Sequence, residues 1–262
     1  MHSPPCTAGN PGDFMKKVML VTGAGRGIGA QVALMAGQRG YAVAVNYQNS
    51  RDAALDVVRQ IEAAGGKAVA LQANVGDSTE VARLFVEVDA QLGTLDVLVN
   101  NAGILASYRV DALDEDNLRK TFEANVYSTF YCCREAVRRM STAHGGRGGV
   151  IVNISSMAAR LAVVAGGTVY SASKGAIDSF NMSLAKEVGL EGIRVNAVRP
   201  GLIDTDIHEA RGGLEKIREM AKSSVQMGRS GSPAEVAEAV LWLASDAASY
   251  VHGSVIEVAG GR

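Results

Sequence analysis

The chain has 262 residues, of which 47% are apolar and 20% charged, and its formal net charge is −1. This balance excludes the strongly basic surfaces with which proteins bind nucleic acid or anionic membranes, and the length fits one large domain or two small ones. No apolar run reaches the roughly 18 residues of a membrane-spanning helix. We therefore expect a globular cytoplasmic protein with neither nucleic acid nor membrane as a partner.

The N-terminal segment differs in composition from the rest of the chain. Residues 1–15 are rich in Pro, Gly and small polar residues and lack the apolar stretch of a secretory signal. They are predicted to be a disordered leader, followed by a single domain over residues 16–262. The three cysteines, among them Cys132 and Cys133, and the four histidines show no metal-ligand spacing, so no metal site is expected.

Short apolar runs alternate with longer amphipathic stretches along the domain. The predicted strands are Val18–Thr22, Tyr41–Asn46, Ala68–Gln72, Leu95–Asn100, Gly149–Ile154, Arg194–Val198 and Ser254–Val258. Helices are predicted over 27–39, 51–64, 78–92, 116–141, 170–190 and 233–245. Strands and helices that alternate in this way predict an α/β fold, a Rossmann-type doubly wound parallel sheet of about seven strands with helices on both faces.

A glycine-rich turn follows the first predicted strand, with the sequence TGAGRGIG over residues 22–29. Glycines at a strand–turn–helix remove the Cβ atoms that would hold a pyrophosphate away from the backbone, and the helix N-terminus attracts that anion. The spacing TGxxxGxG departs from the GxGxxG dinucleotide fingerprint. The turn still predicts nucleotide binding, with five residues as candidate contacts: Gly23, Gly25, Arg26, Gly27 and Ile28.

The end of the second strand bears on which nucleotide is bound. An acidic residue there would accept a hydrogen bond from the ribose 2′-hydroxyl and repel a 2′-phosphate. This chain has none, and it places Arg26 and Arg51 nearby. NADP(H) is therefore predicted and NAD(H) is disfavoured, although both arginines could be plain surface charges. The candidate contacts of this segment are Asn46, Tyr47, Ser50 and Arg51.

Tyr170 and Lys174 are four residues apart at the start of a predicted helix, so both side chains lie on one face. A free tyrosine has a pKa of about 10, and a neighbouring ammonium lowers it by favouring the phenolate.

Ser155 and Ser156 follow the fifth strand, at the sheet edge where doubly wound proteins bind ligands. A hydroxyl there can polarise a substrate carbonyl, although two serines after a strand are also common turn residues.

Two asparagine segments add polar groups. Asn100–Gly103 follows the fourth strand, and Asn125 lies among apolar residues inside the next predicted helix. A polar amide in such a place must be hydrogen-bonded or functional.

With these motifs the chain resembles the short-chain dehydrogenase/reductase family, in its compact single-domain branch of glucose/ribitol-dehydrogenase-like and acyl-carrier-reductase-like enzymes. TGAGRGIG is similar to the TGxxxGxG of that family, Asn100–Gly103 to its NNAG, and Tyr170–Lys174 to its YxxxK. The Pro200-Gly201 pair is similar to its PG segment, and the resemblance spans about residues 17–262.

The resemblance implies a role for each residue of a proton relay. Tyr170 would exchange the proton of the substrate, and Lys174 would hold the nicotinamide ribose and lower the pKa of Tyr170. Ser156 would hydrogen-bond the substrate oxygen, and Asn125 would anchor a water. Family members usually place this serine 13 residues before the tyrosine, whereas Ser156 is 14 before and Ser155 is 15. A one-residue insertion in the 160–168 loop would assign the role to Ser156.

The resemblance also implies cofactor contacts. The third strand has Asn74-Val75 where the family commonly has Asp-Val, and the segment after Pro200-Gly201 would cover the nicotinamide carboxamide, with Thr205 as hydrogen-bonding member. The contacts that it adds are Asn74, Val75, Asn101, Ala102, Gly103, Pro200, Gly201, Ile203 and Thr205, besides Tyr170 and Lys174.

The implied activity is hydride transfer between NADP(H) and a carbonyl or secondary alcohol of a small molecule, by a homotetramer. A cofactor-sensing module without catalysis is the alternative, and an epimerase or dehydratase would need an extra substrate domain. The pocket wall is expected from 104–113, 160–168 and 204–229, the last suggesting a mobile lid in which His208 and Arg211 could meet a polar substrate.

Overall fold

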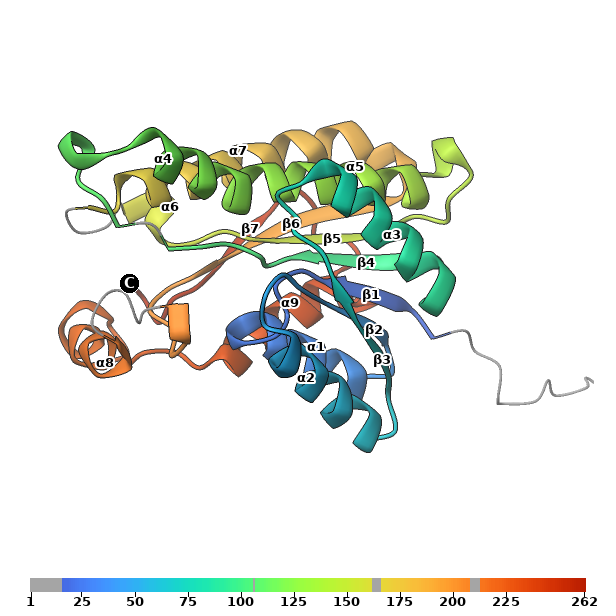
Figure 1. The fold of residues 1–262 in the computed structure, drawn as a ribbon, viewed down its shortest axis with the longest axis horizontal. Coiled ribbons are helices and arrows are strands. Elements are labelled where there is room, and N and C mark those ends of the chain that lie inside the picture. The colour runs from blue at the N-terminus through green and yellow to red at the C-terminus, as the bar shows by residue number, and fades with distance from the viewer. Residues whose placement is uncertain (1–15, 106, 162–165, 208–212) are drawn as a thin grey trace, which may run out of the picture.

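The computed structural model describes residues 16–105, 107–161, 166–207 and 213–262. The predicted leader 1–15, together with His208 and Arg211, lies outside the described residues. Figure 1 shows a central sheet between two layers of helices.

Seven strands form one parallel sheet in the order β3-β2-β1-β4-β5-β6-β7. They are β1 (Val18–Val21), β2 (Ala42–Tyr47), β3 (Lys67–Gln72), β4 (Leu95–Asn100), β5 (Gly149–Ile154), β6 (Ile193–Pro200) and β7 (Val255–Val258). The order reverses between β1 and β4, which opens a ligand crevice at the carboxyl ends of these strands. The predicted fold class is confirmed, with strand ends within two residues of the expected ones.

Helices cover both faces of the sheet. One face carries α1 (Gly27–Gln38), α2 (Arg51–Ala63) and α9 (Pro233–Ala244), and the other carries α3 (Ser78–Leu92), α4 (Glu115–Phe122), α5 (Ser128–Met140) and α7 (Thr168–Val188) (Figure 1). Each face has its own apolar core, because the strands between them are buried on both sides. Met19 and Val45 belong to one core, and Leu20 and Leu98 to the other.

The expected single helix over 116–141 was wrong in one respect. A π-helical turn, Glu123–Tyr127, separates α4 from α5. At this turn Asn125 directs its side chain to hydrogen-bond partners outside the helix, and such widened turns often occur at functional sites.

Two helices were not predicted from the sequence, α6 (Ala158–Leu161) and α8 (Gly213–Ser224). Ile217 and Ala221 of α8 are buried against Leu202, which follows β6. The stretch interpreted as a lid thus contains a helix with an apolar face of its own. Within the described parts of the chain, no helix has the length and apolarity needed to cross a membrane.

Candidate functional site

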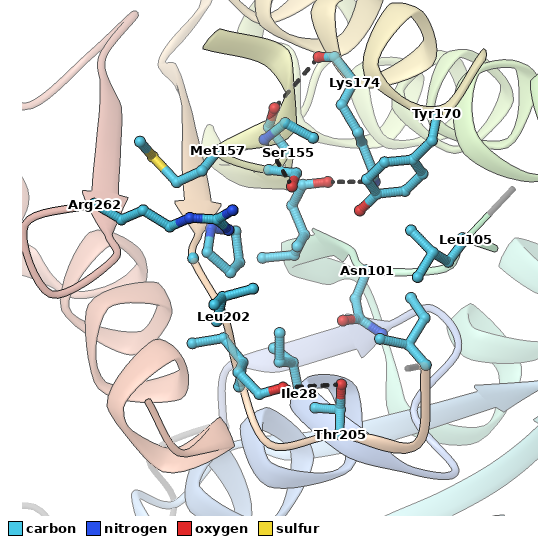
Figure 2. Close-up of a pocket in the computed structure, with 18 residues that line it drawn as sticks. Ile28, Asn101, Leu105, Ser155, Met157, Tyr170, Lys174, Leu202, Thr205 and Arg262 are labelled. Atoms are coloured by element: carbon cyan, nitrogen blue, oxygen red, sulfur yellow. Dashed lines mark hydrogen bonds between the residues drawn. The ribbon is translucent and has the colours of Figure 1, made fainter. Parts of the chain in front are cut away.

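Two clefts meet at the carboxyl edge of the sheet. The larger one has an empty volume of about 1220 Å³ and follows the glycine turn and the ends of β2 and β3. The smaller one is bordered by the ends of β5 and β6 and the start of α7 (Figure 2). They adjoin each other, because five residues line both: Ile28, Asn101, Gly103, Thr205 and Ile207.

The glycine turn borders the larger cleft. Gly23, Gly25, Arg26, Gly27 and Ile28 all line it. Gly23 and Gly27 have φ angles of 61° and 59°, in the left-handed region that favours glycine. The turn leads into α1, whose first backbone N–H groups and positive dipole end attract anions.

The glycine turn is tied to the segment after β4. The Thr22 hydroxyl accepts hydrogen bonds from the backbone N–H groups of Asn101 and Ala102, each at 3.0 Å. Asn101 Nδ2 donates to the carbonyls of Thr22 and Gly23, at 2.9 and 3.0 Å. Asn101, Ala102 and Gly103 line the cleft. The Asn101 amide group, however, forms hydrogen bonds that link the segment after β4 to the glycine turn. No pattern in the sequence indicated that Thr22 would link these two segments.

The end of β2 forms the far wall of the larger cleft. Tyr47 and Ser50 line it. Asn46 also borders it, yet its side chain is buried and engaged: Oδ1 accepts from the backbone N–H of Gly23, and Nδ2 donates to the carbonyls of Leu71 and Ala73. Asn46 therefore braces the glycine turn from the side of the neighbouring strand.

Arg26 and Arg51 are exposed at this end of the cleft. Arg26 precedes α1 and lines the cleft, whereas Arg51 begins α2 directly after Ser50. Neither forms an ion pair with any residue that the structure describes. Two unpaired guanidinium groups beside Ser50 can receive an anion.

Asn74 and Val75 border the larger cleft after β3. The Asn74 carbonyl Oδ1 accepts from the backbone N–H of Gly76 at 3.0 Å, and its own backbone N–H donates to Glu80 at 2.8 Å. These bonds fix the loop, and they leave Asn74 at the cleft wall where the sequence places a cofactor contact.

Tyr170 and Lys174 line the smaller cleft together, from the first turns of α7 (Figure 2). Tyr170 is 9% exposed and packs against Ala158 and Leu105. Lys174 is buried, and its Nζ donates to the Ile154 carbonyl at 2.9 Å and lies 6.0 Å from the centre of the Tyr170 ring. Burial lowers the pKa of Lys174 to about 8, while Asp178, one turn further along α7, acts in the opposite direction.

The two serines after β5 have different surroundings. The Ser155 hydroxyl is buried and donates to the Lys174 carbonyl at 3.3 Å, which ties the strand end to α7. The Ser156 hydroxyl is half-buried and accepts from the backbone N–H of Ala158 at 3.1 Å. Because the Ser156 oxygen accepts in this bond, the hydroxyl hydrogen is available for donation to a ligand. Both serines border the pocket.

Asn125 lies behind the smaller cleft, in the π-helical turn. Its Oδ1 accepts from the backbone N–H of Ile104 at 2.7 Å, and its Nδ2 donates to the Ile104 carbonyl and to the Ser173 hydroxyl, each at 3.0 Å. Ser173 in turn donates to the Tyr170 carbonyl at 2.7 Å. Both amide hydrogens are thus used within the protein, and the side chain links the segment after β4 to the Tyr170 turn.

The segment after β6 supplies the remaining wall. Pro200, Gly201, Ile203 and Thr205 border the pocket, and Thr205 Oγ1 lies 3.5 Å from the Ile203 carbonyl. Among the segments expected to form the pocket wall, 104–113 contributes Leu105 and 204–229 contributes Thr205 and Ile207. No described residue of 160–168 borders it.

Several pocket residues were not foreseen from the sequence. Met157 and Ala158 of the turn after β5 contribute apolar surface, and Arg262 brings a guanidinium group to the wall (Figure 2). Met157 directly follows the serine pair, so the strand-end position could have indicated it. Arg262 is distant in sequence from every motif.

Metal chemistry has no candidate centre in the described part of the chain, where no cluster of three or more His, Cys, Asp or Glu side chains could hold an ion. Cys132 and Cys133 are buried thiols. Burial raises the pKa of Cys133 to about 12 and that of Cys132 well above its usual value. Such thiols remain protonated and inert at neutral pH.

The fold and the two clefts define a doubly wound α/β protein with a tyrosine–lysine pocket. A family model described as Enoyl-(Acyl carrier protein) reductase matches residues 23–262. The chain is 48% identical over 246 residues to "Uncharacterized oxidoreductase YgfF" of Escherichia coli, covering 94% of this chain and 99% of that protein. It is 42% identical to "Versicolorin reductase stcU" of Emericella nidulans, covering 94% and 95%. It is 38% identical to the 3-oxoacyl-[acyl-carrier-protein] reductase FabG of Staphylococcus aureus, covering 94% and 98%.

Solved structures agree with these relatives. A short chain dehydrogenase from Burkholderia cenocepacia, in complex with NADP, has a TM-score of 0.86 and 33% identity, and the match covers 95% of this chain and 99% of that one. A dehydrogenase/reductase from Sinorhizobium meliloti has a TM-score of 0.85 and 35% identity, with 94% of each chain covered. The chain belongs to the short-chain dehydrogenase/reductase family of oxidoreductases.

Proposed function

We propose that this chain is an NADP(H)-dependent oxidoreductase that interconverts a carbonyl and a secondary alcohol on a small molecule. The observation that carries the proposal is that the two clefts adjoin: the large cleft at the glycine turn shares part of its wall with the pocket that holds Ser156, Tyr170 and Lys174. A cofactor in the first would bring its reactive end to the proton-exchanging groups of the second.

The residues of the larger cleft suit a dinucleotide phosphate. The turn between Gly23 and Gly27 and the N-terminus of α1 would hold the pyrophosphate. Arg26, Ser50 and Arg51 would hold the 2′-phosphate, since no carboxylate at the end of β2 would repel it. Asn74 and Val75 would border the adenine, and Thr205 the carboxamide. The NADP in the related Burkholderia structure supports the same choice.

When bound, the nicotinamide supplies or accepts the hydride. Tyr170 donates its phenol proton to the substrate oxygen during reduction and takes it back during oxidation. Lys174, held by the Ile154 carbonyl, places an ammonium beside that tyrosine and favours its phenolate. Ser156 donates to the substrate oxygen, and Asn125 holds the Tyr170 turn in place through Ser173.

The proposal is tested by incubating the full chain with NADPH and a panel of ketones, aldehydes and oxo-esters, and following NADPH oxidation by absorbance. Turnover of at least one carbonyl is expected. A chain that binds NADPH tightly yet oxidises it with no carbonyl would instead support the cofactor-sensing alternative.

The two serines are predicted to differ in their effects on the reaction. Ser156→Ala should lower kcat by about 100-fold, because it removes the hydroxyl that polarises the substrate oxygen. Ser155→Ala should change kcat by less than about 5-fold and act mainly on stability, since a typical buried hydrogen bond contributes about 1 kcal/mol. Steady-state kinetics and urea denaturation of both variants separate the two effects, and the reverse order would move the role to Ser155.

Cofactor selectivity is predicted to depend on the end of β2. NADPH should bind at least about 10-fold more tightly than NADH, because each charged hydrogen bond contributes about 1.5–3 kcal/mol. Tyr47→Asp places a carboxylate at the last residue of β2 and should reverse the preference. Fluorescence titration of both nucleotides measures this, with Lys67→Gln on neighbouring β3 as a control that changes the net charge by the same −1. Equal affinities of the unaltered protein for the two would contradict the prediction.

A further inference from the structure

The pocket contains a second cation besides Lys174. Arg262 follows β7 and lines the pocket that holds Ser156 and Tyr170. Figure 2 shows its guanidinium group directed into the enclosed space, on the side opposite Tyr170. None of the established motifs includes this residue.

The backbone of the segment after β7 is fixed close to the pocket. The Arg262 N–H donates to the Ala259 carbonyl at 3.3 Å, and the Met227 N–H donates to the Gly260 carbonyl at 3.1 Å. Ala259 packs directly on Gly201, where an added Cβ would come within 2.8 Å of the Ala259 Cα. The position of Arg262 is therefore coupled to the Pro200–Gly201 wall.

The guanidinium group has no partner of opposite charge within the described residues. The other long arginine side chains near this edge are paired, Arg199 with Asp178, Arg218 with Asp204 and Arg229 with Glu235. Arg262 makes no such pair, and the described pocket wall contains no Asp or Glu.

The surroundings of Arg262 are apolar. Met157, Pro200 and Leu202 border the same pocket. Arg262 is half-buried, and this burial lowers the pKa of its guanidinium, although an arginine remains charged at neutral pH. A cation held at an apolar wall without a protein counter-ion is complemented by an anionic ligand, because the interaction is stronger where water is partly excluded.

We infer that the substrate of this site carries a carboxylate, which Arg262 binds while its carbonyl or alcohol faces Tyr170. The inference rests on the proposed function and narrows its substrate class to oxo acids or hydroxy acids. A planar carboxylate matches the two parallel N–H groups of one guanidinium. A phosphate presents three acceptor oxygens, whereas Arg262 is the one cation besides Lys174 among the described residues that line this pocket.

The test compares acids with their own neutral esters. The substrates are pyruvate, acetoacetate, levulinate and 5-oxohexanoate, each beside its methyl ester, so that the spacing between carbonyl and carboxylate varies by one carbon. The unaltered protein, Arg262→Met and Arg262→Lys are assayed with NADPH. Arg59→Met, which removes an exposed arginine on α2, is the matched control.

For at least one pair, kcat/KM of the unaltered protein should favour the acid by about 10- to 100-fold, the range of a charged hydrogen bond. Arg262→Met should remove this preference through a raised KM for the acid, with little change in kcat or in the ester reaction. Arg262→Lys should restore part of it, and Arg59→Met should behave as the unaltered protein. Equal kcat/KM for acid and ester in all four pairs, or equal losses for both in Arg262→Met, would overturn the inference.

A binding measurement keeps this inference separate from the proposed function. The thermal midpoint of the protein is measured with each acid and each ester, without relying on turnover. If no acid or ester is reduced, carboxylate binding is supported when an acid raises the thermal midpoint, its ester does not, and the rise is lost in Arg262→Met. If no acid raises the midpoint more than its ester does, the inference is contradicted. Turnover of other carbonyls in the NADPH panel decides the proposed function independently.

Discussion

Replacement of Tyr170 by phenylalanine is expected to lower kcat for carbonyl reduction by about 100- to 10,000-fold, the range over which general acid–base groups contribute. The change removes only the hydroxyl. The ring would keep its contacts with Leu105 and Ala158, so the fold and the cleft should persist. NADPH oxidation under saturating substrate gives kcat, and fluorescence titration of NADPH shows that the cofactor cleft is intact.

Tyr108 offers a control for this experiment. It packs in the same small cluster as Tyr170, but it does not border the pocket. Tyr108→Phe should therefore leave kcat within about 3-fold. Turnover that survives in Tyr170→Phe would overturn the mechanism, whereas an equal loss in both variants would point to packing of the cluster.

Replacement of Lys174 by methionine is expected to reduce kcat by about 100-fold or more, because it removes the ammonium that favours the phenolate. It should have a separate effect on stability. The pKa of Lys174 is lowered from 10.5 to about 8 in the folded protein, mainly by burial. Between these values the unfolded chain binds more protons than the folded one, so the stability contributed by this residue rises with pH.

The sign and size of this effect can be measured. Below pH 8 the full cost of burying the ammonium is present, and by about pH 10.5 it is gone. The difference corresponds to about 3 kcal/mol of unfolding free energy. Urea denaturation at pH 7.5 and pH 10 gives the free energy of unfolding of the unaltered protein and of Lys174→Met. Between these two pH values, the difference between the proteins should change by up to that amount, in favour of the unaltered protein.

Lys186 provides the matched control, because it lies on the same helix but is exposed. For Lys186→Met, the difference in unfolding free energy from the unaltered protein should be nearly the same at the two pH values. If the difference in unfolding free energy between Lys174→Met and the unaltered protein stayed constant with pH, Lys174 would have the ordinary pKa of a lysine.

The positions of the strands along the chain and the shared helix face of the tyrosine–lysine pair were predictable, because both depend on local patterns. Continuous β-branched runs indicate strands buried on both faces, and the four-residue spacing of Tyr170 and Lys174 gives one helix face. The glycine turn was predictable for the same reason, since its motif lies within eight consecutive residues.

The hydrogen-bond partners of the asparagines were not predictable. Asn46 and Asn101 were predicted as cofactor contacts and Asn125 as the anchor of a water, yet the side chain of each forms hydrogen bonds mainly with backbone groups of a segment distant in sequence. Amide side chains donate and accept equally well toward a ligand or a main chain, so composition cannot separate the two uses. Arg262 was missed because only the sheet brings β7 beside β6 and the pocket.

The immobilisation of Lys174 has a thermodynamic consequence for ligand binding. A lysine side chain has about 2 kcal/mol of rotamer entropy, which is lost when the chain is fixed in one conformation. Here the Ile154 carbonyl already holds Nζ, and the helix that carries it is fastened to β5 through Ser155. That loss therefore belongs to the folding equilibrium and not to each encounter with a ligand. A ligand that enters the pocket would therefore meet a lysine that is already ordered.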